Sequence, residues 1–431
     1  MEFHNKNFMK RTVKPSIVIL TIMCVFIGMT GLIGFTGLLY IVVSLFCVLF
    51  ANMEISISIL LINIVYFSYS YINVSFLTGW SNIDYINICN LFFTIRIVIE
   101  SYGNNKLRIK LKKLKADEYI LAILIIIYSL GYVEISIKNV AYQIFMLLSV
   151  LYVCRLIRND EDFGNTFAVQ FIVVLLSVYL YNMLQIDRYS TTHLYWVANR
   201  FVGVRDPNNF ALQCNICMLF VIRYLKKNIS NIKFYLIIMF LSVSSIITLS
   251  VSGFGTTVAI LTYLLFTDKR SKLLKLIFVL LSTVSFGLIV LGDIRINSTA
   301  VFGSLLSRVT NIVHALESGD FYSATTTRSS LWEKYMASFN ELSPIRRYIG
   351  STEFTSNVGK LIGMSSHNNY IDILLNNGYI GLTIYITYLV FHIRNNLKNR
   401  YYTFAMINVV MVLNMFFRSM SGSIAWLGII I

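Results

Sequence analysis

Residues 234–250 read FYLIIMFLSVSSIITLS, and residues 254–268 read FGTTVAILTYLLFTD. Neither stretch holds a charged side chain before Asp268, and Lys233, Lys269 and Arg270 flank the pair. Each stretch is close to the roughly 20 apolar residues that an α-helix needs to cross the hydrocarbon core of a membrane. The pattern therefore predicts two successive transmembrane helices joined by a short hairpin at Ser250–Gly255.

Similar apolar stretches recur along the whole chain. Of its 431 residues 57% are hydrophobic and only 13% are charged, whereas a soluble domain is usually about 25% charged. The candidate helices cover residues 16–34, 36–52, 54–73, 85–101, 118–133, 139–154, 166–186, 208–225, 234–250, 254–268, 274–292, 368–393 and 401–417. We therefore predict an all-α, polytopic integral membrane protein with about 12–14 transmembrane helices, forming a single transmembrane domain over residues 1–431.

The formal net charge of +16 comes largely from connectors between apolar stretches. The basic connectors are Lys106–Lys115, Arg155/Arg158, Arg223–Lys233, Lys269–Lys275 and Arg394–Arg400. All of them fall on one side if the N-terminus is cytoplasmic, which is the side where membrane proteins collect Lys and Arg. We therefore expect a cytoplasmic N-terminus, a first helix that is retained, and no nucleic-acid partner. The short connection near Glu54 lacks positive charge.

This topology leaves two long loops on the outer side, at residues 187–207 and 293–366. The basic residues of these loops are mainly arginines, namely Arg188, Arg200, Arg205, Arg295, Arg308, Arg328, Arg346 and Arg347. Acidic residues bring the net charge of the larger loop close to zero, so its arginines are not a consequence of topology. The planar guanidinium group binds phosphate or carboxylate through two hydrogen bonds at once. Residues 329–339 have helical apolar spacing, and we expect that helix to lie flat on the membrane.

Residues 366–370, Ser-His-Asn-Asn-Tyr, stand at the start of a predicted helix. The imidazole of His367 titrates near neutral pH and can accept a proton from a hydroxyl group. Asn368 either orients that imidazole or caps the helix. By contrast, Cys214 and Cys217 lie inside a predicted helix without a second pair. We therefore expect no metal site and no other cofactor, and no nucleotide-binding or metalloprotease motif is present.

The order of several short motifs resembles the O-antigen polymerase and O-antigen ligase superfamily (Wzy-like proteins). Arg200-Phe-Val-Gly-Val-Arg205-Asp-Pro-Asn208-Asn opens a helix, and the Ser/Gly hairpin at 250–255 follows. Then come Arg328-Ser-Ser-Leu-Trp332, a glycine at 350, His367-Asn368-Asn-Tyr370 and Gly378-Tyr-Ile-Gly381. The resemblance covers about residues 195–390. Many relatives carry an arginine in the hairpin after the serine, where this chain has Gly253 or Phe254.

The resemblance implies a metal-independent glycosyltransferase in the bacterial cytoplasmic membrane. Its substrate would be an oligosaccharide on undecaprenyl diphosphate, and its product an O-antigen (part of lipopolysaccharide) or a capsule. A protein that regulates chain length commonly accompanies the family. His367 and Arg328 are the expected catalytic residues. The expected substrate-binding residues are Arg200, Arg205, Asn208, Asn368, Trp332 and Tyr370.

Polymerase and ligase share this motif region, so both activities remain open. A polymerase transfers the growing chain onto a new lipid-linked unit, whereas a ligase transfers it to another acceptor. A flippase or other transporter of lipid-linked oligosaccharides is a third reading. A transporter should place charged residues within spans and contain internal repeats. Arg96 is the clearest charged residue within a span, and no repeat is evident, so we expect a polymerase.

Overall fold

The computed structural model describes residues 18–19, 21–23, 35–62, 82–103, 116–130, 137–184, 196–197, 200–201, 207–248, 250–267, 314, 317–319, 328–351, 366–416 and 428–431. Most of these residues are helical. The α-helices are α2 (Phe35–Phe50), α3 (Met53–Ile62), α5 (Asn82–Gly103), α6 (Ala116–Leu130), α7 (Ile137–Asn159), α8 (Glu161–Leu184), α10 (Pro207–Phe220), α11 (Asn231–Ile247), α12 (Val251–Thr267), α16 (Arg328–Asn340), α17 (Pro344–Ile349), α19 (Asn369–Lys398) and α20 (Tyr402–Met415). A π-helical turn, η4 (Val221–Leu225), continues α10.

The helices follow the predicted apolar stretches closely. The predicted ranges 85–101, 234–250 and 401–417, for example, agree to within three residues at each end with α5, α11 and α20. Three helical stretches are long and apolar enough to cross a membrane, namely Val140–Asn159, Glu161–Leu180 and Asn369–Lys398. The predicted helix at 274–292 and most of the one at 16–34 lie outside the described residues.

Local sequence explains where several of these helices begin. Pro207 is the first residue of α10, a position that needs no amide hydrogen and suits the fixed φ of proline. Glu161 and Asp162 occupy the first turn of α8, where carboxylates favour the positive end of the helix dipole. The side chain of Ser230 caps α11 by accepting a hydrogen bond from the amide of Lys233.

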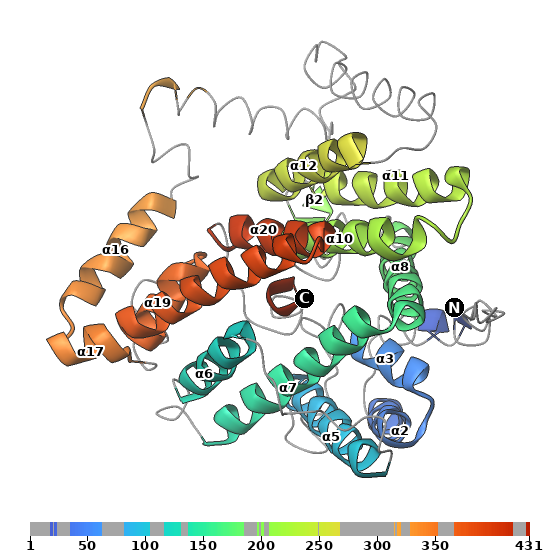
Figure 1. The fold of residues 1–431 in the computed structure, drawn as a ribbon, viewed down its shortest axis with the longest axis horizontal. Coiled ribbons are helices and arrows are strands. Elements are labelled where there is room, and N and C mark those ends of the chain that lie inside the picture. Colours follow the sequence, from blue (N-terminus) through green and yellow to red (C-terminus); the bar gives the residue numbers. More distant parts are fainter. Residues whose placement is uncertain are drawn as a thin grey trace, which may run out of the picture.

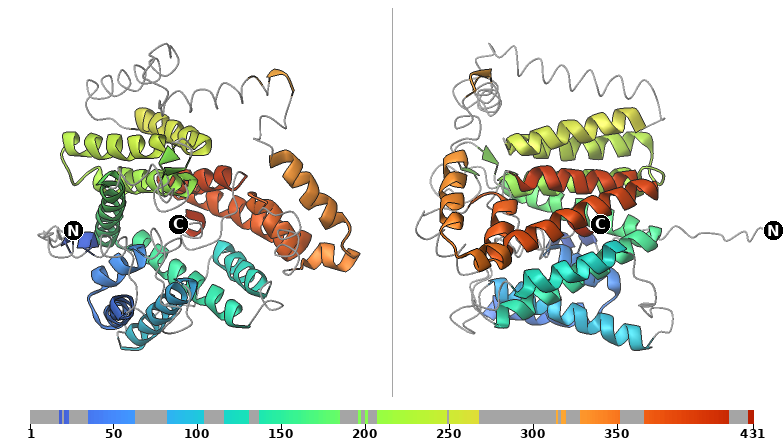
Figure 2. Two further views of the ribbon diagram at one scale, coloured as in Figure 1. Left: turned by 180° about the vertical axis from the view of Figure 1, so that it is seen from behind. Right: turned by 60° about the vertical axis from the view of Figure 1, so that its left-hand side comes forward.

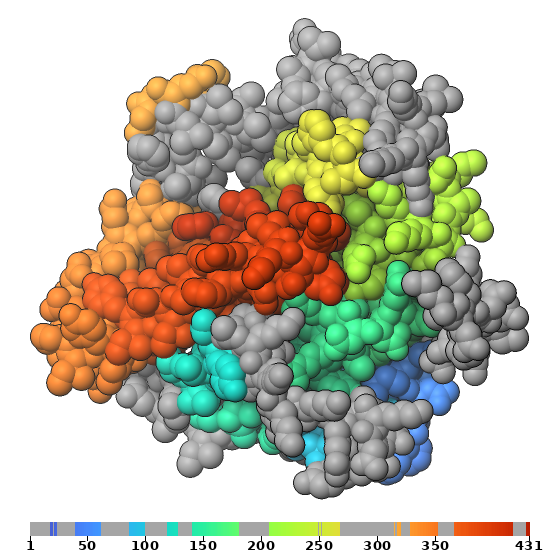
Figure 3. All heavy atoms as spheres, in the orientation of Figure 1, coloured from blue at the N-terminus to red at the C-terminus, as the bar shows by residue number. Residues whose placement is uncertain are grey.

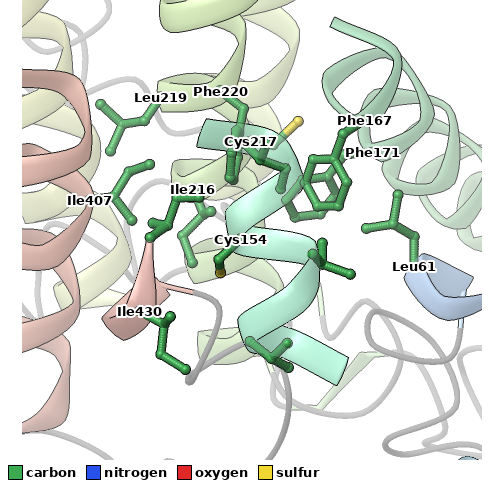
Figure 4. Close-up of a cluster of buried hydrophobic side chains, with 14 of the residues drawn as sticks. Leu61, Cys154, Phe167, Phe171, Ile216, Cys217, Leu219, Phe220, Ile407 and Ile430 are labelled. Carbon is green, nitrogen blue, oxygen red and sulfur yellow. The ribbon is translucent and has the colours of Figure 1, made fainter. Parts of the chain in front are cut away.

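The helices form a bundle whose centre is filled by apolar side chains from distant parts of the chain (Figures 1 and 4). The ring of Phe220 on α10 lies 5.1 Å from that of Phe167 and 6.3 Å from that of Phe171, both on α8. The hydroxyl of Tyr224 donates a hydrogen bond of 2.5 Å to the carbonyl of Ile157, which ties η4 to the last turns of α7. Cys217 is fully buried in this core.

A short hairpin was not expected from the sequence. Strands β1 (Trp196–Val197) and β2 (Arg200–Phe201) pair antiparallel, with Trp196 opposite Phe201 and Val197 opposite Arg200. The hairpin lies at the same end of the bundle as α16 and α17 (Figure 2, right). Two-residue strands carry too little alternation of apolar and polar residues to be recognised in a sequence.

Helix α16 confirms the prediction of a helix at 329–339. Its apolar face packs on the first turns of α19. The contact contains Leu331, Tyr335 and Phe339 from α16 with Leu374 and Leu375 from α19. In the right-hand view of Figure 2, α16 runs crosswise over one end of the bundle. The helical spacing was informative, but it does not say which surface an apolar face will cover.

Candidate functional site

Two of the predicted motifs meet where α16 crosses the start of α19. The indole Nε1 of Trp332 donates a hydrogen bond of 3.0 Å to the backbone carbonyl of Ser366. This bond joins the helix that begins with Arg328 to the residue that precedes His367. Apolar burial below it fixes the orientation of α16, since Tyr335 and Phe339 are fully buried. The site can therefore present residues of both motifs on one surface.

The three residues 366–368 form a braced turn. The hydroxyl of Ser366 lies 2.5 Å from Asp372 Oδ1 and accepts a hydrogen bond of 3.0 Å from the amide of Asn368. The side chain of Asn368 accepts hydrogen bonds from the amides of Tyr370 and Ile371, at 3.0 and 3.2 Å. Asn368 is thus the N-cap of α19 and satisfies two amides that lack partners within the helix. Of the two roles predicted for Asn368, capping is the one observed.

His367 stands in the middle of this turn with a positive φ of 50°. That conformation is uncommon for residues other than glycine and costs of order 1–3 kcal/mol when the surroundings impose it. Ser366 and Asn368 are buried on either side, whereas His367 is half-buried. The turn therefore holds the imidazole at the surface in a conformation that the chain would not choose alone.

Asp372 also faces the buried phenol of Tyr335. Burial raises the pKa of Tyr335 above 10.0, and the negative charge of Asp372 raises that pKa further. The junction of α16 and α19 therefore contains a neutral phenol and an acidic side chain bonded to Ser366. Sequence reasoning missed both residues, although Asp372 was visible as an acidic residue in the first turn of a helix.

A second close contact joins the end of α17 to the middle of α19. Helix α19 is kinked at Gly378, where φ is 64° and ψ is −168°. The end of α17 sits in this kink, and the amide of Ser351 donates a hydrogen bond of 3.0 Å to the carbonyl of Leu375. Gly350 also has a positive φ of 83°. The two glycines singled out in the sequence thus let two backbones touch.

Of the remaining four predicted residues, the structure describes three. Arg200 lies in β2, and Asn208 is the second residue of α10. Arg205 lies outside the described residues. Tyr370 is half-buried, its hydroxyl donates to the carbonyl of Val412 at 3.1 Å, and its ring centroid lies 4.5 Å from that of Phe416. Contacts within the protein therefore involve both the hydroxyl and the ring of Tyr370.

The Ser/Gly hairpin is packed around a buried amide that sequence reasoning did not single out. Asn215 of α10 donates hydrogen bonds to the carbonyl of Gly253 at 3.0 Å and to Thr256 Oγ1 at 2.5 Å. Thr257 Oγ1 donates to Asn215 Oδ1 at 2.8 Å. A Cβ atom on Gly253 would lie 2.5 Å from the Cβ of Ala211. Helix packing therefore leaves no room for an arginine at Gly253, one of the two positions compared with the arginine of the superfamily that the sequence resembles.

The opposite end of the bundle carries basic and aromatic residues. Arg158 of α7 bonds to the side-chain oxygen of Asn396 of α19. Its guanidinium lies 5.7 Å from the ring centroid of Phe404, and that of Arg223 lies at the same distance from that centroid. Such cation–π contacts keep arginines beside apolar helices. The ends of α7, η4 and α19 and the start of α20 therefore meet at one basic surface.

No family model, curated protein or solved structure matches the chain. Within the described residues there is no group of three or more His, Cys, Asp or Glu side chains that could hold a metal ion.

Proposed function

We propose that this chain is a polytopic enzyme of the bacterial cytoplasmic membrane. In this proposal it polymerises O-antigen or capsule from repeat units carried on undecaprenyl diphosphate, at the outer face of that membrane. The ordered motifs between residues 195 and 390 suggest this activity. The hydrogen bond from Trp332 to Ser366 is the observation that supports it most directly. That bond puts the Arg328 motif beside the His367 motif, as a shared active site requires.

The uneven distribution of charge supports the orientation. Arg158 and Arg223 lie beside Phe404 at one end of the bundle. At that end Lys398, the last residue of α19, and Arg400, between α19 and α20, are both exposed. Cytoplasmic loops accumulate such residues. The α16–α19 junction lies at the other end of α19 and so belongs to the outer face in this arrangement. The 293–366 loop and a cytoplasmic N-terminus belong to the same proposal.

In the proposed reaction one bond at the anomeric carbon breaks, a new one forms there, and one proton is transferred. A hydroxyl oxygen of the acceptor sugar attacks the anomeric carbon of the donor, and the bond from that carbon to the diphosphate breaks. The electron pair leaves with undecaprenyl diphosphate, and the hydroxyl proton passes to the neutral imidazole of His367. Arg328 and Arg200, with Arg205, stabilise the charge that develops on the leaving diphosphate; one preorganised donor of this kind is worth about 3–4 kcal/mol.

The tight packing of the hairpin at 250–255 limits which residues can hold the phosphates of the substrate. An arginine at position 253 would have to displace Ala211, which a Cβ atom at that position already approaches within 2.5 Å. In this chain the diphosphate must therefore rely on arginines outside the hairpin. Arg328 is the leading candidate, because Trp332 on the same helix bonds to Ser366, the residue before His367.

The first test is a gel of surface and lipid-linked glycan from cells that lack the protein and from cells in which it is restored. A polymerase predicts single repeat units and no ladder in the deletion strain. Long chains that stay on undecaprenyl diphosphate would instead indicate a ligase, and repeat units trapped on the cytoplasmic side a flippase.

Variants then test the site itself. Arg328→Ala and His367→Ala should each abolish the ladder, whereas Lys334→Ala should leave it unchanged. Lys334 is exposed on the same helix as Arg328 and so controls for a general effect of changing α16. A normal ladder from both Arg328→Ala and His367→Ala would show that the active site lies elsewhere.

A further inference from the structure

The exposure of the side chains of α19 differs on the two sides of its kink at Gly378. All residues from Asn369 to Gly378 are buried or half-buried. Directly after the kink an exposed apolar stripe begins, and its members are Tyr379, Ile380, Ile386, Val390, Phe391 and Leu397. A helix face that stays apolar and exposed over five turns is the surface that a lipid bilayer covers.

The length of the second half of α19 fits a membrane. The stretch Tyr379–Lys398 contains 20 residues, which at 1.5 Å per residue is about 30 Å, the thickness of the hydrocarbon core. Basic residues occur only in its last turns, at Arg394 and Lys398. The lipid boundary on the side of the candidate site therefore falls at Gly378–Tyr379.

Helix α17 sits at that level and exposes an apolar face of its own. Ile345, Tyr348 and Ile349 are 71%, 59% and 59% exposed. Their spacing places them on one face of the helix. The ring centroid of Tyr348 lies 5.9 Å from that of Tyr379, so this face adjoins the exposed stripe of α19. Figure 3 shows α17 at the rim of the molecule, next to the first part of α19.

The arginines of α17 are turned toward its own segment. Arg346 Nη1 donates a hydrogen bond of 2.7 Å to Ser351 Oγ, and Arg347 Nε donates one of 2.9 Å to the carbonyl of Leu342. The helix is therefore amphipathic, with isoleucines and a tyrosine on one side and two guanidinium groups on the other. Tyrosine at the boundary and arginine at the level of the phosphates are typical of a segment in the membrane interface.

We propose that α17 is an interfacial anchor, with Ile345, Tyr348 and Ile349 inserted at the boundary between lipid headgroups and acyl chains. The occupant of this face is the lipid bilayer. The apolar face of α17 adjoins the exposed stripe of α19, so one partner must cover both surfaces. A lipid bilayer covers such a continuous apolar surface, and this favours lipid over a second copy of the chain. The anchor holds the kink of α19 at the membrane surface. His367 then stands at most about 15 Å beyond the boundary, because ten helical residues separate them.

The anchor can be tested without any assay of glycosyl transfer. The full chain is reconstituted into vesicles of phosphatidylethanolamine and phosphatidylglycerol in equal parts. An environment-sensitive fluorescent amino acid replaces Ile349 in one preparation and Lys334 of α16 in a matched control. Both side chains are exposed in the protein. The lipids carry bromine near the headgroup end of the acyl chains, which quenches only a fluorophore that touches them.

The proposal predicts that the probe at position 349 is blue-shifted and loses about half of its emission to brominated lipid. The probe at position 334 should keep a water-like spectrum and its full emission. A water-like, unquenched probe at 349 would overturn the proposal. So would a blue-shifted probe that brominated lipid does not quench and that crosslinks to a second copy when a photoreactive residue replaces Tyr348. A probe at Ile345 repeats the measurement if the change at Ile349 prevents folding.

Discussion

The backbones of Gly350 and Gly378 meet face to face, each with a positive φ. A Cβ atom on Gly378 would overlap the carbonyl of Tyr348 and the amide of Gly350, and one on Gly350 would overlap the peptide between Asn376 and Asn377. This contact joins α17 to the kink of α19 and so fixes both the candidate site above it and the proposed anchor beside it. Conformation and space both require glycine at these two positions.

We expect Gly378→Ala to lower the free energy of unfolding by about 1–3 kcal/mol, because the left-handed conformation and the overlap with α17 both oppose a side chain. Gly255→Ala is the matched control. Gly255 lies in α12 with nothing within 4 Å of the Cβ position, so alanine there should be neutral or stabilise by about 0.5–1 kcal/mol. Thermal unfolding in detergent measures both. Equal melting temperatures for the two variants would argue against the close backbone contact.

The role of His367 can be separated from the strain in its backbone. Asparagine adopts a positive φ far more readily than most residues, so His367→Asn should fold and reach the membrane at the normal level. It lacks the imidazole that accepts the proton, and we expect glycan polymerisation to fall by about 10²–10⁴-fold. Quantitative gels of the ladder, with protein level from immunoblots, measure this. Full activity of His367→Asn would mean that the residue shapes the turn and carries no proton.

The burial of Tyr335 and the negative charge of Asp372 predict a change in stability at alkaline pH. The folded pKa of Tyr335 is raised above 10.0, so its contribution to stability is fully present below the unfolded pKa of about 10 and is lost as pH rises through the folded value. Tyr335→Phe removes this titration. Wild-type and Tyr335→Phe melting temperatures should therefore show a constant difference at neutral pH and converge or cross above pH 10.

The sequence predicted the helices well and their contacts poorly. Uncharged stretches of helical length are specified locally, so α11, α12 and α20 were found within a few residues. The contact of Trp332 with Ser366 and that of Gly350 with Gly378 join segments that are distant in the chain, and spacing within one segment carries no information about them. Capping of α19 by Asn368 was among the predicted roles because a cap depends only on neighbouring amides.

The buried amide of Asn215 provides the last prediction. Three hydrogen bonds link its side chain to Gly253, Thr256 and Thr257 across α10 and α12. Bonds between membrane helices average about 0.6 kcal/mol each, and an unpaired buried partner costs more. Asn215→Leu should therefore lower the free energy of unfolding by about 2 kcal/mol or more, as measured by denaturation in mixed micelles. Asn228→Ala removes an exposed asparagine between η4 and α11 and should cost much less. If Asn215→Leu is as stable as the wild type, apolar packing alone holds α10 against α12, and the hairpin at 250–255 is free to serve the substrate.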